Sequence, residues 1–359
     1  MTVVHTHALR LTRPGGAARF EPVRLPPPGR HEVLVEVAAA GLCGSDLHVL
    51  DGPPAPLEAA LPFTLGHEVA GTVAVVGEDV RAVRPGDPVA VYGPWGCGAC
   101  PRCREGSENY CAQRSRLGYA GVGLGRDGGI AGAVLVPHER HLLPLAGLDP
   151  VQAAPLTDAG LTSYHAVSLA LPRLPADPVV AVLGVGGLGH LAIQVVRALA
   201  PAAVIVAADV RSEALELATR CGAQHAVRSE RGAAGILAAT GGHGANAVLD
   251  MVGSQQTLEL ATGLLRPGAD LVVVGSGGGR LELAKGSGLP AGVRVSLPFW
   301  GSRPDLGRVL ALARAGALRV EVETFPLSQA GQALDRLRQG TIRGRAVLVP
   351  DSTPPRESA

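Results

Sequence analysis

The sequence predicts an α/β protein of two domains: an irregular, mostly antiparallel β domain and a domain with a doubly wound parallel sheet. At 359 residues, the chain exceeds the size at which one hydrophobic core stops growing, so two domains are expected. The pattern along the chain also changes near Leu156. Short Val-rich runs separated by Gly and Pro precede this point, and apolar strands alternating with helical stretches come after it. The first pattern is typical of antiparallel β structure and the second of a doubly wound sheet.

The predicted elements divide the chain between these two domains. The runs Glu32–Val37 and Gly71–Gly77 are strands of the first domain. The second domain, residues 160–296, is predicted to contain the alternating strands and helices Val179–Leu183, Ala192–Leu199, Val204–Ala208, Ser212–Cys221, Ala247–Val252 and Leu271–Gly275. A helix at Leu327–Arg338 and a strand at Ala346–Val349 are assigned to the first domain, which then covers residues 1–159 and 297–359. The residues from Asp351 to the end are predicted to be a disordered tail.

The composition favours small-molecule chemistry. Hydrophobic residues make up 47% of the chain but aromatic residues only 3%, so any aromatic side chain near a motif is a candidate for a pocket. A net charge of +1 provides no basic field for nucleic acid or for an anionic membrane surface. The most membrane-like stretch, residues 179–208, is interrupted by glycines and polar side chains and is predicted to be a buried strand, helix and strand. The N-terminus shows no secretory signal, so we expect a cytoplasmic protein.

A cluster of four cysteines is the most specific local signal. Their spacing, with two, two and seven intervening residues, lets four thiolates surround one zinc ion, and cysteines two residues apart seldom meet disulfide geometry. An iron–sulfur cluster is the nearest alternative, but the bacterial ferredoxin run has only three residues before its fourth cysteine. The sequence therefore predicts a structural zinc bound by Cys97, Cys100, Cys103 and Cys111.

A glycine motif comes directly after a predicted strand and opens a predicted helix. It reads Gly184-Val185-Gly186-Gly187-Leu188-Gly189. In this context the missing side chains let the backbone approach a pyrophosphate, to which the helix N-terminus offers free N–H groups. Asp209 comes 20 residues after Gly189 at the end of the next predicted strand, where a carboxylate would bind the adenosine ribose. NAD is therefore favoured over NADP, although Arg211 lies close by.

The chain resembles the zinc-dependent medium-chain alcohol dehydrogenases from about residue 20 to Pro350. The resemblance rests on the cysteine cluster, the glycine motif, Gly66-His67-Glu68 and Cys43-Gly44-Ser45-Asp46. Residues 93–100 and 157–162 are similar, more narrowly, to bacterial NAD-dependent secondary-alcohol dehydrogenases. The resemblance implies a GroES-like catalytic domain and a Rossmann domain that binds NAD.

The resemblance also implies a catalytic zinc, which makes two zinc ions per chain. Its ligands would be Cys43, His67 and Asp158, with Glu68 as a transient alternative ligand and the fourth position open to a substrate oxygen. Asp46 would orient His67. Ser45 would touch the substrate oxygen, and His48 would form the outer end of a proton relay. An ordinary loop position for His48 stays open.

Further matching positions concern the cofactor and the substrate. Thr162 matches a contact behind the nicotinamide ring, and Arg343 matches a pyrophosphate-binding arginine; either could instead be an ordinary surface residue. The positions that would line the alcohol pocket are Trp95, Leu124, Phe299 and Trp300, although a core role for Leu124 is an alternative.

The predicted activity is reversible hydride transfer between secondary or primary alcohols, or ketones, and NAD, with the chain as a homodimer or homotetramer. A polyol dehydrogenase of the same fold is the closest rival, but its substrates call for polar groups where this chain offers Trp and Phe. A non-catalytic cofactor-binding protein is the other alternative, but such a protein would be expected to lack zinc ligands. A short-chain dehydrogenase is excluded because Lys285, the only lysine, has Leu281 rather than Tyr four residues before it.

Overall fold

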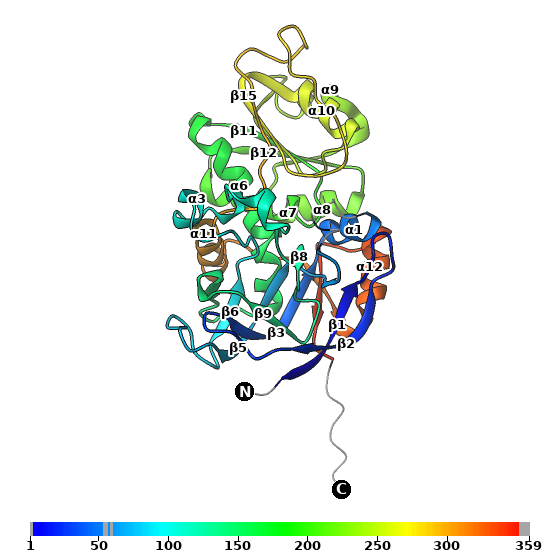
Figure 1. Cartoon of the computed structure of the whole chain (residues 1–359). Helices are drawn as coiled ribbons and strands as arrows, with labels where there is room; N and C mark the ends of the chain where they lie inside the picture. The colour runs from blue at the N-terminus through cyan, green and yellow to red at the C-terminus, as the bar shows by residue number, and fades with distance from the viewer. Residues whose placement is uncertain (1–2, 53–56, 58–59, 352–359) are drawn as a thin grey trace. The chain divides into compact units, whose positions relative to one another are not determined.

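The computed structural model describes residues 3–52, 57 and 60–351, and their contacts divide the chain into two compact units (Figure 1). The first unit comprises residues 1–158, 302–310 and 320–359, and the second comprises residues 159–301 and 311–319. The predicted tail beyond Asp351 lies outside the described residues. Within the described part of the chain, every helix is too short or too polar to cross a membrane.

The first unit is built on a seven-stranded, mostly antiparallel sheet. Six of its strands lie in the order β10-β6-β5-β3-β18-β17, and β9 also pairs with β3. Their bounds are β3 Val33–Leu42, β5 Glu68–Val76, β6 Pro88–Val91, β9 Ala133–Val136, β10 Leu142–Pro144, β17 Val322–Pro326 and β18 Arg345–Val349. A second sheet contains β1 (Val4–Leu11), β2 (Arg19–Leu25) and β4 (Phe63–Thr64), and β7 (Gly121–Val122) pairs with β8 (Gly125–Arg126). The central strand β3 is buried along most of its length, so it holds the start of helix α1 in a fixed position.

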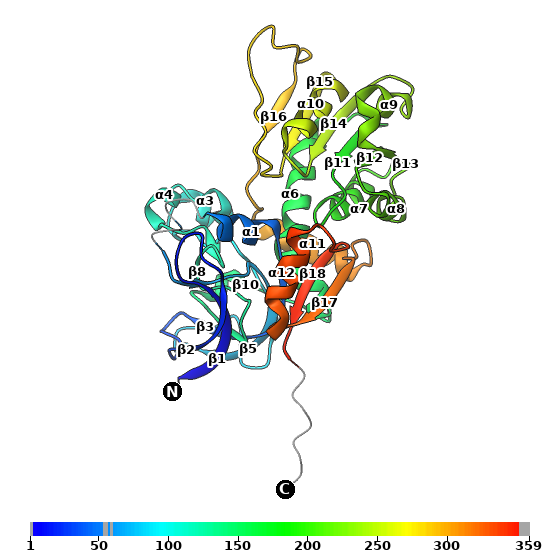
Figure 2. The same ribbon diagram turned by 90° about the vertical axis from the view of Figure 1, so that its right-hand side faces the viewer.

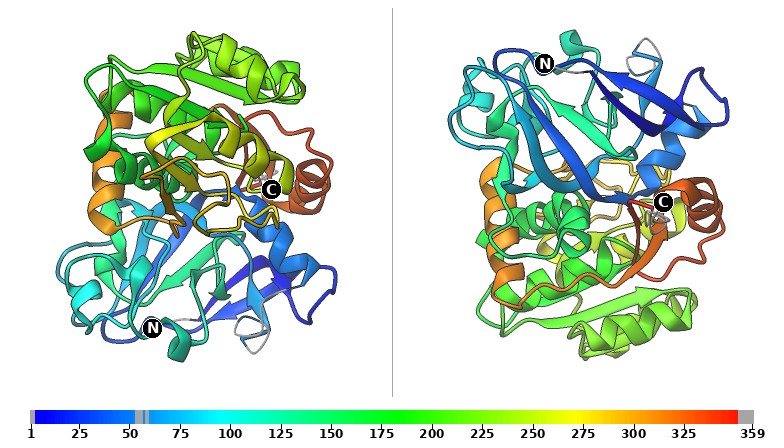
Figure 3. Two further views of the ribbon diagram at one scale, coloured as in Figure 1. Left: turned by 90° about the horizontal axis from the view of Figure 1, so that it is seen from above. Right: turned by 90° about the horizontal axis from the view of Figure 1, so that it is seen from below.

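Short helices connect and cover these strands. They are α1 Gly44–Asp51, α3 Pro101–Arg104, η1 Glu108–Tyr110, α4 Arg114–Leu117, η2 Glu139–His141, α5 Pro150–Ala153, η3 Ala154–Thr157, η6 Leu327–Gln329 and α12 Ala330–Arg338. The helix predicted at Leu327–Arg338 therefore begins as a 3₁₀ turn. Helix α12 lies beside β17 and β18 (Figure 2) and beside α1 (Figure 3). Arg338 of α12 forms an ion pair with Asp51 of α1.

The second unit contains a six-stranded, entirely parallel sheet in the order β13-β12-β11-β14-β15-β16. This is the strand order of a dinucleotide-binding doubly wound fold, in which the first strand is central and the order reverses beside it. The bounds are β11 Val179–Leu183, β12 Val204–Asp209, β13 His225–Arg228, β14 Ala245–Asp250, β15 Leu265–Val273 and β16 Arg294–Ser296.

Helices flank this sheet, with α7 against α8 and α9 against α10 (Figure 2). The helical elements are α6 Ala159–Ala170, η4 Leu171–Arg173, α7 Gly189–Leu199, α8 Ser212–Arg220, η5 Ser229–Arg231, α9 Gly232–Ala238 and α10 Gln255–Leu264; α11 (Arg303–Arg314) begins in the first unit and ends in the second. Local sequence accounts for the helix ends. Ser254 caps α10 by accepting a hydrogen bond from Thr257 N–H, and Gly222 comes just after α8 with φ of 103°, a conformation that favours glycine.

The observed units differ from the predicted domains at three places, of which the first is Ala159, the start of α6, which groups with the second unit. Residues 297–301 group with the second unit because Gly301 packs against α6: a Cβ there would lie 2.5 Å from Leu161 Cδ1. Residues 311–319 also group with the second unit. In this segment the N–H and C=O groups of Arg319 both form hydrogen bonds with the side-chain amide of Gln194 on α7.

Candidate functional site

The predicted catalytic zinc ligands converge within the first unit although they come from distant segments. Cys43 lies between β3 and α1, His67 precedes β5, and Asp158 comes directly after η3. Asp158 Oδ2 lies 3.5 Å from Cys43 Sγ and 3.4 Å from His67 Nε2. The three ligand atoms all lie within 4.8 Å of one another. The structure therefore brings the predicted ligand set together at one point.

The residues around this point hold the ligands in place. Asp46 is fully buried on α1, where its Oδ2 accepts a hydrogen bond from Cys43 N–H and its Oδ1 lies 3.3 Å from His67 Nδ1. Thr157 Oγ1 accepts a hydrogen bond from Val69 N–H and donates one to Ala154 C=O, which fixes the turn that presents Asp158. Each ligand thus has a neighbour that limits its movement, as metal sites require.

The charges of the site fit a divalent cation. Burial lowers the pKa of His67, but Asp46 and Asp158 raise it well above its usual value. Surroundings that favour a proton on His67 also favour a metal cation. One thiolate, one carboxylate and one neutral imidazole offset the charge of Zn²⁺, and these are ligands that zinc accepts at a catalytic site with one position left for substrate. The residues therefore fit zinc.

A buried ion pair between Glu68 and Arg345 lies beside the ligands. Of its two residues, only Glu68 was among the predicted site residues. Glu68 is fully buried and accepts a hydrogen bond from Arg345 Nη2 of β18. Burial raises the pKa of Glu68 to about 7, against the opposing charge of Arg345. The carboxylate also needs a glycine beside it, because a Cβ at Gly41 would lie 1.8 Å from Glu68 Oε2. Arg345 and Gly41 carry no local motif that would have identified them.

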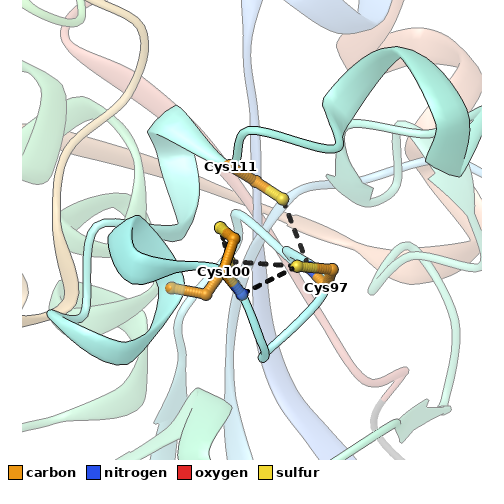
Figure 4. Close-up of side chains that lie close together, drawn as sticks. Cys97, Cys100 and Cys111 are labelled. Carbon is orange, nitrogen blue, oxygen red and sulfur yellow. Dashed lines mark hydrogen bonds between the residues drawn. The ribbon is translucent and has the colours of Figure 1, made fainter.

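The four clustered cysteines converge on a lobe formed by α3 and η1. Cys103 Sγ lies 3.8 Å from Cys97 Sγ and 3.4 Å from Cys100 Sγ, which is far longer than a disulfide bond. All four sulfur atoms lie within 4.8 Å of one another, and Figure 4 shows three of the residues. N–H groups, first that of Cys103, lower the pKa of Cys100 to about 6, and the N–H groups of Ala99 and Cys100 lower that of Cys97. Two of the four thiols thus ionise readily, whereas burial raises the pKa of Cys103. Four sulfur atoms at these distances fit a structural zinc, which itself favours the thiolate form of its ligands.

Glu108 fixes this lobe to the rest of the unit, and it was not predicted. Only 2% of Glu108 is exposed. Its carboxylate accepts hydrogen bonds from Gly96 N–H at 2.6 Å, Arg140 Nε at 2.9 Å and His141 Nε2 at 3.2 Å. Burial raises its pKa, but the bonds from His141 and Arg140 outweigh burial and lower the pKa to about 2. A buried carboxylate with three donors is a strong anchor.

We expect Glu108→Gln to destabilise the protein by about 3 kcal/mol at pH 7, because the native pKa is lowered by about 2.5 from 4.5. A lowered native pKa contributes stability that is complete above pH 4.5 and is lost as the pH falls toward 2. Urea unfolding should therefore show a constant difference from the wild type above pH 5 and a smaller one below pH 4.5. Glu105→Gln, in the same lobe but exposed, is the control. Equal effects of the two substitutions would contradict the anchoring role of Glu108.

The predicted nucleotide motif has the expected strand–turn–helix setting in the second unit. It joins β11 to α7, and a Cβ at Gly189 would lie 1.9 Å from Gly184 C=O, so only glycine fits there. Asp209 ends β12 and accepts hydrogen bonds from Val185 N–H at 2.7 Å and from Arg211 N–H at 2.9 Å. A cavity of about 530 Å³ lies beside them, lined by Gly184, Asp209, Val210, Ser229, Val252, Ser254 and Thr257, among others.

Family models match most of the chain. Residues 29–147 match the alcohol dehydrogenase GroES-like domain, and residues 187–315 match the zinc-binding dehydrogenase domain. An NAD-dependent alcohol dehydrogenase of Sulfurisphaera tokodaii is 37% identical over 96% of this chain and 99% of its own length. The chain belongs to the zinc-dependent medium-chain alcohol dehydrogenases. The predicted family and α/β fold are thus confirmed.

Two further relatives of this dehydrogenase span nearly its whole length. The solved alcohol dehydrogenase of Aeropyrum pernix superimposes with a TM-score of 0.85 at 35% identity, covering 96% of this chain and 100% of that one. A D-arabinose 1-dehydrogenase (NADP⁺) of Saccharolobus solfataricus is 34% identical over 98% of this chain and 99% of its own length. The relatives thus include enzymes named for different substrates and for both nicotinamide cofactors.

The remaining predicted residues of the dehydrogenase are distributed over both units. Ser45 is partly buried and His48 exposed on α1. Trp95 is buried, donates to Tyr92 C=O and packs 5.7 Å from the His141 ring, and Leu124 is buried in the same unit. In the second unit, Trp300 is buried and its ring is 5.8 Å from that of the exposed Phe299. The alcohol pocket of these four side chains stays a prediction.

Thr162 and Arg343 also stay predictions. Thr162 is buried on α6, which excludes an ordinary surface position. Arg343 is exposed and its Nε forms an ion pair with Glu321 at 3.1 Å, so its guanidinium already has a partner within the first unit.

Proposed function

We propose that this dehydrogenase interconverts secondary alcohols and ketones with NAD. The convergence of Cys43, His67 and Asp158 carries this proposal, because three ligands leave one position for a substrate oxygen. The glycine motif and Asp209 support a dinucleotide as the hydride acceptor. Bound NAD⁺ would supply the acceptor for the hydride of the carbinol carbon, so that alcohol and NAD⁺ would yield ketone, NADH and one proton.

The side chains of the first unit would prepare and deprotonate the alcohol. A bound zinc supplies a Lewis acid for the substrate oxygen. Ser45 Oγ lies 3.8 Å from Cys43 Sγ, so its hydroxyl adjoins the ligand set and can relay the alcohol proton by accepting it while its own proton is passed on. His48 lies three residues further along α1, and residues at this spacing share one face of a helix. Its exposed imidazole can therefore transfer the proton to water.

A substrate screen tests the proposal. Initial rates with NAD are measured for 2-alkanols, for aryl ketones in the reverse direction with NADH, and for polyols and aldoses. We expect apolar secondary alcohols to have the highest kcat/KM, because Trp95, Phe299 and Trp300 are the predicted pocket residues. A sugar dehydrogenase is the second candidate, supported by the identity with the D-arabinose 1-dehydrogenase. Higher kcat/KM with aldoses or polyols would establish that second candidate instead.

Asp209 is proposed to set the cofactor preference. Burial raises its pKa, but bonds from Arg211 and Val185 lower it below its usual value, so the carboxylate is ionised and would repel a 2′-phosphate. Asp209→Ser should shift the ratio of kcat/KM values toward NADP by roughly 10- to 100-fold, in part because Arg211 loses its ion pair with Asp209. Asp177→Ser, at an exposed aspartate of the same unit, is the control. A wild type that already prefers NADP would contradict this assignment.

We further propose that the chain forms homo-oligomers. Strand β16 ends the six-stranded sheet, and Leu297 directly after it is 75% exposed. An open strand edge next to exposed apolar side chains favours association. Sedimentation velocity distinguishes the 36.5 kDa chain from a dimer or tetramer. A cytoplasmic location is also proposed, because the free thiols suit a reducing compartment.

A further inference from the structure

Two buried side chains form hydrogen bonds with carbonyl groups of the nucleotide loop, which is the glycine motif of residues 184–189. His190 is fully buried on α7, and its Nδ1 lies 2.8 Å from Gly186 C=O. A carbonyl only accepts hydrogen bonds, so the imidazole donates through Nδ1–H. Ser163 of α6 is fully buried as well, and its hydroxyl donates to Leu188 C=O at 2.9 Å. The glycine motif by itself does not imply either contact.

The opposite side of the same loop presents N–H groups. Within the described part of the chain, the N–H groups of Gly186, Gly187 and Leu188 donate no hydrogen bond. Val185 N–H differs, because Asp209 accepts its hydrogen bond. A Cβ at Gly186 would meet only Arg211 Nη2, at 3.8 Å, so the space beside Gly186 is open. Unpaired N–H groups at the start of an eleven-residue helix are suited to a phosphate.

The two sides of the loop are linked through one peptide plane. Gly186 C=O and Gly187 N–H belong to the same planar, trans peptide group, in which they point in opposite directions. The backbone alone holds this carbonyl weakly, because His190 N–H lies 3.4 Å from it. The shorter bond from Nδ1 therefore determines the direction of the carbonyl and, with it, the direction of Gly187 N–H.

We propose that His190 is a positioning residue for the cofactor: its Nδ1–H bond to Gly186 C=O directs Gly187 N–H toward the pyrophosphate of NAD. The inference rests on the proposed placement of the pyrophosphate at this loop. Without the bond, the flexible glycine pair must be ordered when the cofactor binds, and the cost appears as a lower affinity. The effect is specific to ligands that carry the pyrophosphate.

The test uses the zinc-loaded enzyme and three substitutions. His190→Asn retains an amide donor near the position of Nδ1, whereas His190→Gln displaces the amide by one carbon and His190→Leu removes the donor. Dissociation constants are measured for NADH by fluorescence and for ADP-ribose by calorimetry, and adenosine is measured as a competitive inhibitor against NAD. Adenosine lacks the pyrophosphate. His243→Leu, at an exposed histidine of the same unit, is the control.

We expect His190→Leu and His190→Gln to weaken the binding of NADH and ADP-ribose by about 5- to 10-fold, which corresponds to the loss of one hydrogen bond. His190→Asn should remain within about 3-fold of the wild type, and adenosine should bind all variants alike. Three results would each overturn the inference. They are an equal loss of affinity for adenosine, equal affinities of the His190→Asn and His190→Gln variants for NADH and ADP-ribose, and an unchanged affinity for ADP-ribose in the His190→Leu variant. If His190→Leu does not fold, the Asn and Gln pair decides. A wild type that does not bind ADP-ribose would overturn the pyrophosphate placement itself.

Discussion

Asp158→Ala is expected to reduce kcat/KM for alcohol oxidation by about a thousand-fold or more. Lewis-acid stabilisation contributes several kcal/mol to a transition state, and each 1.4 kcal/mol is a factor of ten. Asp158 Oδ2 is within 3.5 Å of both other predicted ligands, so its removal leaves Cys43 and His67 alone. The zinc content of purified protein should fall from two ions per chain to one.

Two controls separate the loss of the metal from a loss of folding. Asp158→Cys replaces the carboxylate with a thiolate, another zinc ligand, and should retain two zinc ions with partial activity. Asp177→Ala changes an exposed aspartate and should leave both quantities unchanged. Retention of two zinc ions by Asp158→Ala would remove Asp158 from the ligand set.

Cys100→Ala should lower the thermal unfolding midpoint by about 10 °C and release the other zinc ion. Structural zinc contributes several kcal/mol or more to folding, and 1 kcal/mol corresponds to about 2 to 4 °C for domains of 150 to 250 residues. Cys100 Sγ lies 3.4 Å from Cys103 Sγ, and the pKa of Cys100 is lowered to about 6. The Cys100 thiol therefore ionises easily and can bind a metal at neutral pH. Differential scanning calorimetry together with metal analysis measures both effects.

Cys221→Ala is the matched control for this prediction. Cys221 lies outside the lobe, at the end of α8, where Gln194 Nε2 is 3.6 Å from its sulfur atom. The same substitution there should shift the midpoint by no more than about 2 to 4 °C and leave two zinc ions bound. If Cys100→Ala and Cys221→Ala lower the unfolding midpoint and the zinc content equally, the cluster is not a zinc site.

Local signals predicted much of this structure. The cysteine spacing and the glycine motif act over short distances, so the lobe and the β11–α7–β12 arrangement were predicted from the chain itself. Strand β13 was missed because His225–Arg228 is short and mostly exposed, which gives no apolar run. The family resemblance, rather than any pattern, predicted Cys43, His67 and Asp158.

Tertiary partners could not be predicted. Glu68 and Arg345 are 277 residues apart, and an arginine near the C-terminus carries no signal of burial. Glu108 looks like an ordinary charged residue of a cysteine-rich loop until Arg140 and His141 are placed around it. His190 likewise has the spacing of a common helix residue, and only its distance to Gly186 C=O shows its role.

The position of β18 in its sheet has a consequence for biosynthesis. This strand pairs with β3 at Ala346 and Leu42, yet the ribosome makes it after the entire second unit. Until it emerges, the Ala40–Leu42 end of β3 lacks its partner strand, although β9 already pairs with the start of β3, and Glu68 lacks its cationic partner Arg345. Domains fold as units from the N-terminus during synthesis. The parallel sheet of the second unit can therefore be complete before β18 has been added to the sheet of the first unit. The metal centre should therefore mature only after β18 has been synthesised, so a nascent chain that stops before Arg345 should bind zinc at the cysteine lobe but not at Cys43, His67 and Asp158.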